Sequence, residues 1–315
     1  MEKFKSISNA ELKYFTWTVT KKTIAIFLTI IAFNSCKEPK EVDQSKTNYS
    51  IPSHPWFDVT KIESGVWRIS DHGEDNIYLV EGKDSALLID SGIGAVNLVA
   101  LLKQLTKLPI IVVNTHGHPD HVGSNNQFNR AYAHPDEIEM IQYFTAPETH
   151  QTMLQYMVHI AINDSLKFTD TLTSVLHPVA EGHVFDLGGK RIEVIHTPGH
   201  TQGSICLLDR EDKLLFTGDH VKKEAWLHTD EALPLTVYLS SLRKLDVRKK
   251  EFIKLLSGHD DPLDVEFLSE QITCAESIIS LSCKGEPFES VVGNGLVCEF
   301  RRAKIAFDPK KIQNN

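Results

Sequence analysis

The chain has 315 residues, of which 41% are hydrophobic and 24% are charged. This composition supports a folded core and excludes a chain that is disordered throughout. Residues 1–35 carry five Lys and two Glu, so their removal would change the net charge from −9 to −12. Because nucleic-acid affinity depends on Lys and Arg side chains that neutralise phosphates, so acidic a protein is not expected to bind nucleic acid.

The first segment has the pattern of a secretory signal. Two Lys residues precede the apolar run 23–33, which has about half the ~20 residues that a membrane-spanning helix needs. The run leads to Cys36 and a polar stretch, which resembles a bacterial lipoprotein signal except for the bulky Phe33. We therefore predict a signal peptide over 1–35, a lipid anchor at Cys36, and a bacterial cell-envelope location, either lipid-anchored or periplasmic. An uncleaved anchor is the alternative.

Residues 36–57 are expected to be a polar tether, and 58–315 the folded domain. The runs VWRIS, NIYLVEG and ALLIDSG are short, apolar or alternating, and separated by turn residues, which predicts strands. Residues 98–108 have apolar side chains at helical spacing, and Pro109 follows as a stop. The β-branched run IIVV then predicts a strand that is buried on both faces.

Residues 136–176 are expected to be mostly helical and to form a lid over a binding site. Candidates for its lining, with core packing as the alternative for each, are Tyr143, Phe144, Tyr156 and His159, together with Trp226 and His228 from a later loop. The second half repeats the strand pattern, adds helices near 234–248 and 264–282, and ends in one or two strands within 295–307. Alternating strands and helices in two halves predict an α/β sandwich with the helices outside.

Four cysteines follow Cys36: Cys206, Cys274, Cys283 and Cys298. Four cysteines allow three disulfide connectivities, and their spacing favours none of them. Cys206 lies in the apolar run SICLL and is expected to be a core thiol.

The densest group of potential metal ligands lies within six residues. It comprises His116, His118, Asp120 and His121. The two histidines at alternate positions point the same way in an extended segment. Gly117 removes a side chain where an ion would approach. So many imidazoles in one place would repel one another when protonated, and the density therefore predicts a metal site rather than a solvated turn.

Three more ligand-type residues each follow an apolar strand and a glycine. They are His200 in RIEVIHTPGHT, Asp219 in KLLFTGD, and His259 in FIKLLSGH. Sites in α/β sheets gather beyond the carboxyl ends of strands. The four segments are therefore expected to meet.

The pattern THGHPDH, TPGHT, TGD and GH resembles the metallo-β-lactamase-fold superfamily over roughly residues 58–300. The resemblance implies a four-layer αββα sandwich with a binuclear metal site. One ion would be held by His116, His118 and His200. The other would be held by Asp120, His121 and His259. Asp219 would bridge the two.

The resemblance and the many imidazoles favour two Zn²⁺ ions as the cofactor, with Fe or Mn as alternatives. Zinc accepts imidazole and carboxylate ligands and lowers the pKa of a bound water to about 7. A metal-bridging hydroxide is then expected to attack the acyl (ester, thioester, lactone or lactam) or phosphoryl centre of a small-molecule substrate. Asp120 is the predicted catalytic residue, which would orient the nucleophile or relay a proton.

A bridging aspartate resembles the general branch of the superfamily, including glyoxalase II-type thioesterases and lactonases, more than the true β-lactamases. The helical substrate domain of glyoxalase II is not recognisable in this sequence. Two alternatives remain open: a β-lactamase or lactonase proper, and a non-catalytic metal-binding envelope lipoprotein. His196 and His220 are expected beside the ligands or in the core, and His134 in a structural role. The sequence carries no signal for an oligomeric state.

Overall fold

The computed structural model describes residues 53–157 and 173–313. The predicted signal peptide, Cys36 and most of the tether lie outside these ranges, as does His159. None of the helices within the two ranges combines the length and the apolar character that a membrane crossing requires.

A seven-stranded sheet dominates the first half, with its strands side by side in chain order. They are β1 (Phe57–Glu63), β2 (Val66–Asp71), β3 (Asp75–Glu81), β4 (Ala86–Ile89), β5 (Ile110–Val113), β6 (Arg130–Ala133) and β7 (Val175–Pro178). Strands β1 to β4 are antiparallel, whereas β4 to β7 are parallel. The carboxyl ends of β4, β5 and β6 therefore lie at one edge of the sheet.

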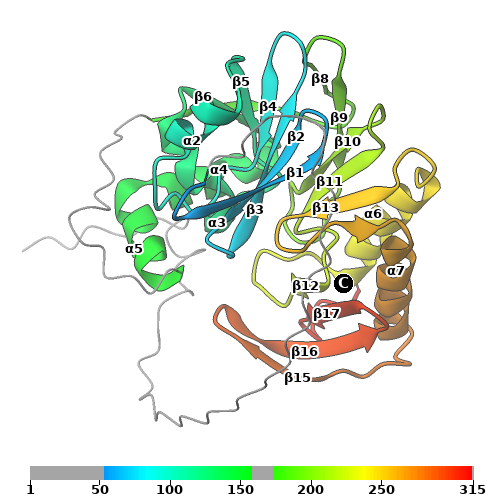
Figure 1. Ribbon diagram of the computed structural model, residues 1–315. Coiled ribbons are helices and arrows are strands. Elements are labelled where there is room, and N and C mark those ends of the chain that lie inside the picture. Colours follow the sequence, from blue (N-terminus) through cyan, green and yellow to red (C-terminus); the bar gives the residue numbers. More distant parts are fainter. Residues whose placement is uncertain (1–52, 158–172, 314–315) are drawn as a thin grey trace, which may run out of the picture. The chain divides into compact units, whose positions relative to one another are not determined.

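Helices fill the connections between the parallel strands (Figure 1). They are α2 (Leu98–Leu105), α3 (Pro119–Val122), α4 (Ile138–Thr145) and α5 (Pro147–Met157), with the short 3₁₀ helices η2 (Gly123–Gln127) and η3 (Pro135–Glu137). Helix α2 begins where Asn97 Oδ1 accepts a hydrogen bond from the Ala100 amide at 2.9 Å. Its leucines face the sheet, as their helical spacing predicts.

A six-stranded sheet forms the second half, in the order β14-β13-β11-β10-β9-β8. Its strands are β8 (Val184–Asp186), β9 (Arg191–His196), β10 (Ile205–Asp209), β11 (Leu214–Gly218), β13 (Lys254–Ser257) and β14 (Leu263–Asp264). Helix α6 (Leu235–Val247) connects the parallel pair β11 and β13, and α7 (Glu266–Ile279) follows β14. Both helices begin and end within three residues of their predicted bounds.

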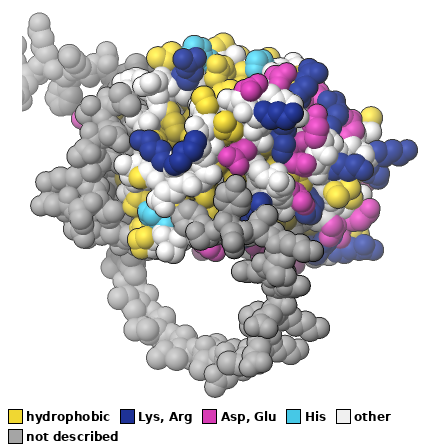
Figure 2. All heavy atoms as spheres, turned by 45° about the horizontal axis from the view of Figure 1, so that its top comes forward, with side chains coloured by type: hydrophobic (Ala, Val, Ile, Leu, Met, Phe, Trp, Pro, Cys, Tyr) yellow, Lys and Arg dark blue, Asp and Glu magenta, His cyan; other side chains and the backbone are white. Residues whose placement is uncertain are grey.

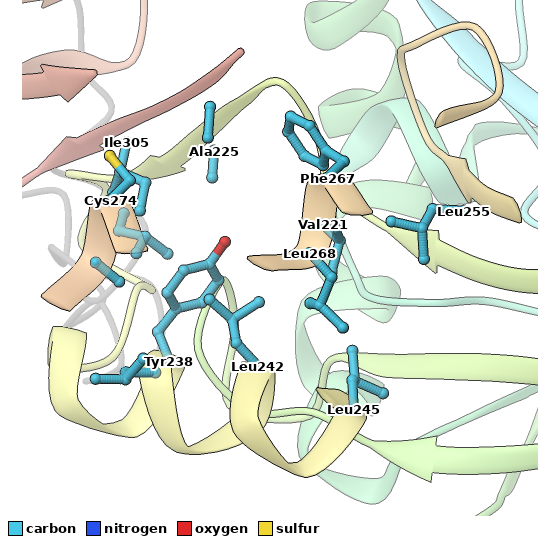
Figure 3. Packing of buried hydrophobic residues seen from close by; sticks show 14 of the residues in the cluster. Val221, Ala225, Tyr238, Leu242, Leu245, Leu255, Phe267, Leu268, Cys274 and Ile305 are labelled. Carbon is cyan, nitrogen blue, oxygen red and sulfur yellow. The ribbon is translucent and has the colours of Figure 1, made fainter. Parts of the chain in front are cut away.

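Three apolar clusters produce the layers. One lies between the two sheets, and one lies on the outer face of each sheet. Side chains from β2 to β5 meet side chains from β9, β10, β11 and β13 between the sheets. The outer face of the first sheet packs on α2, and the outer face of the second packs on α6 and α7. Figure 3 shows Tyr238 and Leu242 of α6 facing Phe267 and Leu268 of α7 in that outer cluster. The predicted αββα sandwich is therefore confirmed.

A third sheet of four strands was not expected from the sequence. It has the order β12-β17-β16-β15, formed by β12 (Glu224–Leu227), β17 (Ala303–Phe307), β16 (Gly293–Phe300) and β15 (Glu286–Ser290). The segment predicted to contain one or two terminal strands contains most of β16 and all of β17, whereas β15 before it and β12 from an earlier loop were not predicted as part of this sheet. A disulfide links Cys283 to Cys298 of β16, while Cys206 and Cys274 are buried free thiols. The prediction of a core thiol at Cys206 is confirmed.

The range 136–176 contains two helices but is not helical to its end, because β7 begins at Val175 and pairs with β6. The part from 158 to 172 lies outside the described residues. On the face shown in Figure 2, Lys and Arg side chains of the described residues lie among Asp and Glu side chains.

Candidate metal centre

Three histidine side chains from two loops meet at one point. His116 and His118 lie in the loop after β5, and His200 lies in the loop between β9 and β10. The Nδ1 atom of His118 is 3.0 Å from Nε2 of His116 and 3.0 Å from Nε2 of His200. Such separations are compatible with three nitrogens that bind one ion at about 2.0–2.1 Å each.

A second group of possible ligands lies beside the first. Asp120 and His121 belong to α3, and His259 follows β13. The Oδ2 atom of Asp120 is 3.4 Å from Nε2 of His121 and 3.4 Å from Nε2 of His259. This group has the carboxylate-imidazole composition of a second zinc-type site.

Asp219 lies between the two groups, at the end of β11. Its Oδ1 atom is 3.3 Å from Nε2 of His121 and 3.1 Å from Nε2 of His259. Its Oδ2 atom is 3.7 Å from Nε2 of His200. The Oδ2 atom is also 3.2 Å from Nε2 of His259, so the carboxylate lies between the two groups and could contact an ion in either. A side chain at Gly258 could not fit, because its Cβ would lie 2.6 Å from Asp219 Oδ1.

The centre of the cluster contains buried polar atoms that lack hydrogen-bond partners among the described residues. They include Nε2 of His121 and Oδ1 of Asp219. Such atoms cost free energy unless something binds them, and two metal ions would satisfy both. The residues present therefore fit the metal ions that the resemblance implies. All seven predicted ligand residues are brought together, and their binding of metal stays a prediction.

A buried aspartate that sequence reasoning missed orients two of the histidines. Asp90 follows β4, and its Oδ2 atom is 2.9 Å from Nδ1 of His121. The same oxygen accepts a hydrogen bond from the Thr115 hydroxyl, whose Oγ1 is 3.1 Å from Nδ1 of His116. These contacts use the Nδ1 atoms and leave Nε2 of each ring for an ion. The one feature of the sequence that could have pointed to Asp90 is its position directly after the strand ALLI.

Backbone carbonyls orient two more rings. Nδ1 of His200 is 2.9 Å from the Trp226 carbonyl in β12, and Nδ1 of His259 is 2.6 Å from the Glu74 carbonyl. Because a carbonyl only accepts, each Nδ1 carries the proton and each Nε2 is free to bind an ion. The unexpected third sheet therefore positions His200 through β12.

The electrostatics of His116, His200 and Asp219 suit cation binding. Burial and the neighbouring imidazoles hold the pKa values of His116 and His200 well below their usual range, so both rings are neutral. Burial raises the pKa of Asp219, but His259 and Lys222 lower it more, and the carboxylate stays ionised. Burial lowers the pKa of His121, but Asp120 and Asp90 raise it more, so an ion would have to displace its proton. Neutral imidazoles and ionised carboxylates are the forms that bind metal.

Lys222 is a second residue that sequence reasoning missed. Its ammonium is 2.7 Å from Asp219 Oδ2, and its side chain is only 10% exposed. It also lies 5.5 Å from the ring centroid of Trp226. Lys222 therefore holds Oδ2 of Asp219 and adds a positive charge at the edge of the cluster.

The remaining histidines that the sequence singled out lie outside this cluster. The rings of His134 and His196 stack at 4.1 Å with an interplanar angle of 7°, close to Asp136. Because imidazole lone pairs lie in the ring plane, two parallel stacked rings cannot both point at one ion, and we assign no metal to this pair. His220 is buried against Tyr238, where burial lowers its pKa to about 3.

The candidates for the substrate lining have mixed positions. Phe144 is buried in the core, whereas Tyr156 of α5 donates a hydrogen bond to the Val291 carbonyl at 2.9 Å. His228 is buried and lies 2.8 Å from the Ser290 hydroxyl. Helix α5 and the β15–β16 hairpin are thus joined at the tip of the hairpin, while β12, at the other edge of the third sheet, contacts His200 through the Trp226 carbonyl.

A model of the metallo-beta-lactamase superfamily matches residues 71–259, which include all seven predicted ligands. The chain belongs to the metallo-beta-lactamase superfamily. The prediction that it is an enzyme, a metal-dependent hydrolase, is confirmed with it. An acyl-coenzyme A thioesterase, MBLAC2 of Bos taurus, is 30% identical over 235 residues, which cover 68% of this chain and 84% of that protein.

Other similar proteins extend the comparison. The hydroxyacylglutathione hydrolase GloC of Haemophilus influenzae is 26% identical over 190 residues, 59% of this superfamily member and 85% of that protein. Among solved structures, a metallo-beta-lactamase from Pontibacter korlensis has a TM-score of 0.52 at 22% identity and covers 70% of this chain and 99% of its own. The sec-alkylsulfatase Pisa1 of Pseudomonas sp. has a TM-score of 0.56 at 18% identity, over 72% and 42% of the two chains. The two structures show the fold.

Proposed function

We propose that the protein is a binuclear zinc hydrolase that cleaves acyl thioesters of small molecules. The convergence of His116, His118, His200, Asp120, His121, His259 and Asp219 around unpartnered buried atoms carries this proposal. The substrate class is supported by the similar thioesterases and by the hydroxyacylglutathione hydrolase. The carboxylate between the two groups, Asp219, supports the general hydrolase branch that the sequence predicted.

Bound zinc ions would supply Lewis acidity and a water with a pKa near 7. The residues of the chain place that chemistry. Asp120 is 21% exposed at its side chain, so it contacts the cluster and also reaches solvent. Burial raises its pKa, but His121 and His259 lower it more, so the carboxylate stays ionised and can hold a water proton. Lys222 balances the charge of Asp219 beside it.

The test is a substrate panel with metal analysis on the purified protein. We expect two equivalents of zinc and thiol release from acyl-CoA and acylglutathione thioesters at a kcat/KM at least about tenfold above that for lactone, β-lactam and phosphodiester substrates. The isosteric Asp120→Asn variant, which cannot accept a proton, should lose on the order of 10²–10⁴-fold in kcat. Two bound metals without turnover of any substrate would instead support a metal-binding lipoprotein. Preferred turnover of a lactam or lactone would reject the thioester assignment.

We also propose that the chain is exported and held at a bacterial cell envelope by a lipid on Cys36, with residues 1–35 removed. The support is the pattern of two Lys, an apolar run and a cysteine followed by a polar stretch. Cells that express the full chain and are grown with labelled palmitate should yield labelled protein in the membrane fraction. Cys36→Ser should abolish the label, whereas Cys206→Ser should keep it. Unlabelled wild-type protein in the cytoplasmic fraction would contradict both the anchor and the location.

A further inference from the structure

A buried carboxylate that belongs to no ligand group lies behind the three-histidine group. Glu137 is the last residue of η3 and is 0% exposed. Its Oε2 atom accepts a hydrogen bond from the amide of Gly117 at 2.7 Å. Its Oε1 atom accepts one from the amide of Gly203 at 2.6 Å. The side chain of Thr201 hydrogen-bonds the same carboxyl.

The hydrogen-bond partners of Glu137 lie in the two loops that carry the three histidines. Gly117 lies between His116 and His118, and Gly203 lies three residues after His200. The first loop joins two elements of the first sheet, and the second joins two strands of the other sheet. One carboxylate therefore holds two backbone segments that come from different sheets and that carry all three histidines of the first group.

The fit around Glu137 is close on both sides. A Cβ at Gly203 would lie 2.8 Å from Cγ of Glu137, and a Cβ at Gly117 would lie 3.0 Å from its Oε2. Both glycines are thus required for the approach of the carboxylate to the backbone. Within residues 53–157 and 173–313, no Lys or Arg forms an ion pair with Glu137, and its oxygens are bound by backbone and hydroxyl donors. A carboxylate held by such donors fixes geometry, because each donor must stay in line with an oxygen.

We propose that Glu137 is a positioning residue that sets the separation between the His116–His118 pair and His200, and so determines the affinity of the three-histidine site for its ion. The carbonyl of Trp226 orients one ring, and Asp90 contacts His121 and the Thr115 amide of the first loop, whereas Glu137 accepts hydrogen bonds from the backbone of both loops. It precedes α4, whose Met140 packs at Gly117. The start of the predicted lid is therefore tied to the metal loops through Glu137 and Met140.

The discriminating variant is Glu137→Gln, which keeps the shape and one carbonyl oxygen but turns an NH₂ group toward one of the two amides. Glu139→Gln is the matched control, because Glu139 is exposed two residues away in α4. Metal is first removed from the protein with a chelator. Zn²⁺ is then titrated back in the presence of a competing chelator. The Glu137→Gln protein should bind the ion of the three-histidine site about 10–100-fold more weakly, which is the range for substitutions of residues that contact metal ligands. Its Zn²⁺ affinity at the second site, and both affinities of the Glu139→Gln control, should stay within about threefold of wild type.

A second measurement needs neither metal nor substrate. In the metal-free wild-type protein, the amides of Gly117 and Gly203 should exchange with solvent deuterium slowly although neither lies in a strand or helix. Glu137→Gln should accelerate exchange in 115–121 and 199–204 and leave the strands unchanged. Fast exchange of both amides in the wild type, or unchanged zinc affinity in a folded Glu137→Gln protein, would overturn the proposal. Neither readout depends on which substrate the enzyme cleaves, so this test is separate from that of the proposed function.

Discussion

Replacing His118 by Ala is expected to release the ion of the three-histidine site and to lower kcat/KM by more than about 100-fold. The Nδ1 atom of His118 lies 3.0 Å from the nitrogens of both His116 and His200, so its loss leaves two imidazoles with no third partner. Substitution of outer partners alone costs about 10–100-fold in metal affinity or activity, and loss of a ligand should cost more. Metal content by mass spectrometry and steady-state kinetics on the best thioester measure the two effects.

A matched control is available in His196→Ala. His196 is the last residue of β9, just before the loop that carries His200. Its ring stacks on His134 and contacts the Gln202 carbonyl rather than the cluster. This variant should keep two equivalents of metal and near wild-type turnover. If His118→Ala also kept its full metal load and its activity, His118 would not be a ligand.

The sequence was informative about the site because each ligand lies next to a local signal. His116, His118, Asp120 and His121 lie within six residues, and His200, Asp219 and His259 each follow a strand that ends in or before a glycine. The strands before His200, Asp219 and His259 have their carboxyl ends at the same edge of the second sheet. Local patterns were therefore sufficient to predict the meeting point.

The supporting residues could not be predicted in this way. Glu137 is 66 residues from Gly203 and Asp90 is 31 residues from His121, and nothing local marks either pairing. Asp90 stands after an ordinary buried strand, and Glu137 stands in the ordinary helix start HPDE. Their roles depend on how two sheets pack, which the linear spacing of residues does not contain.

The third sheet escaped prediction for a related reason. Its strand β12 is four residues long and pairs in parallel with β17, about 80 residues later in the chain. Short alternating runs indicate strands but not their partners. The Cys283–Cys298 bridge is one of six possible pairs among the four cysteines, and only the fold, which brings the end of α7 close to β16, selects it. Only Val175 and Leu176 of β7 fell within the predicted helical range, because a strand of four residues gives little local signal in the sequence.

Replacing Asp219 by Ser is the second change with a large expected effect, and it acts on metal binding and on stability together. Oδ1 of Asp219 faces His121 and His259, and Oδ2 lies 3.2 Å from His259 and 3.7 Å from His200, so serine would remove the carboxylate oxygens that lie between the two groups. We expect fewer than two bound metals per chain and a loss in kcat/KM of more than about 100-fold. Undiminished binding of two metals would show that Asp219 does not bridge them.

The same substitution removes the partner of a buried cation. Lys222 is 10% exposed and 2.7 Å from Asp219, and breaking a buried pair by removing one partner costs about 3–5 kcal/mol. Metal-free Asp219→Ser should therefore unfold at lower denaturant concentration than wild type. The double variant Asp219→Ser, Lys222→Met should regain much of this stability, because no unpaired charge remains buried, yet it should not regain the second metal. If the double variant recovered metal binding as well, the repulsion of Lys222 would explain the single variant, and the role of Asp219 would be electrostatic balance rather than a bond to both ions.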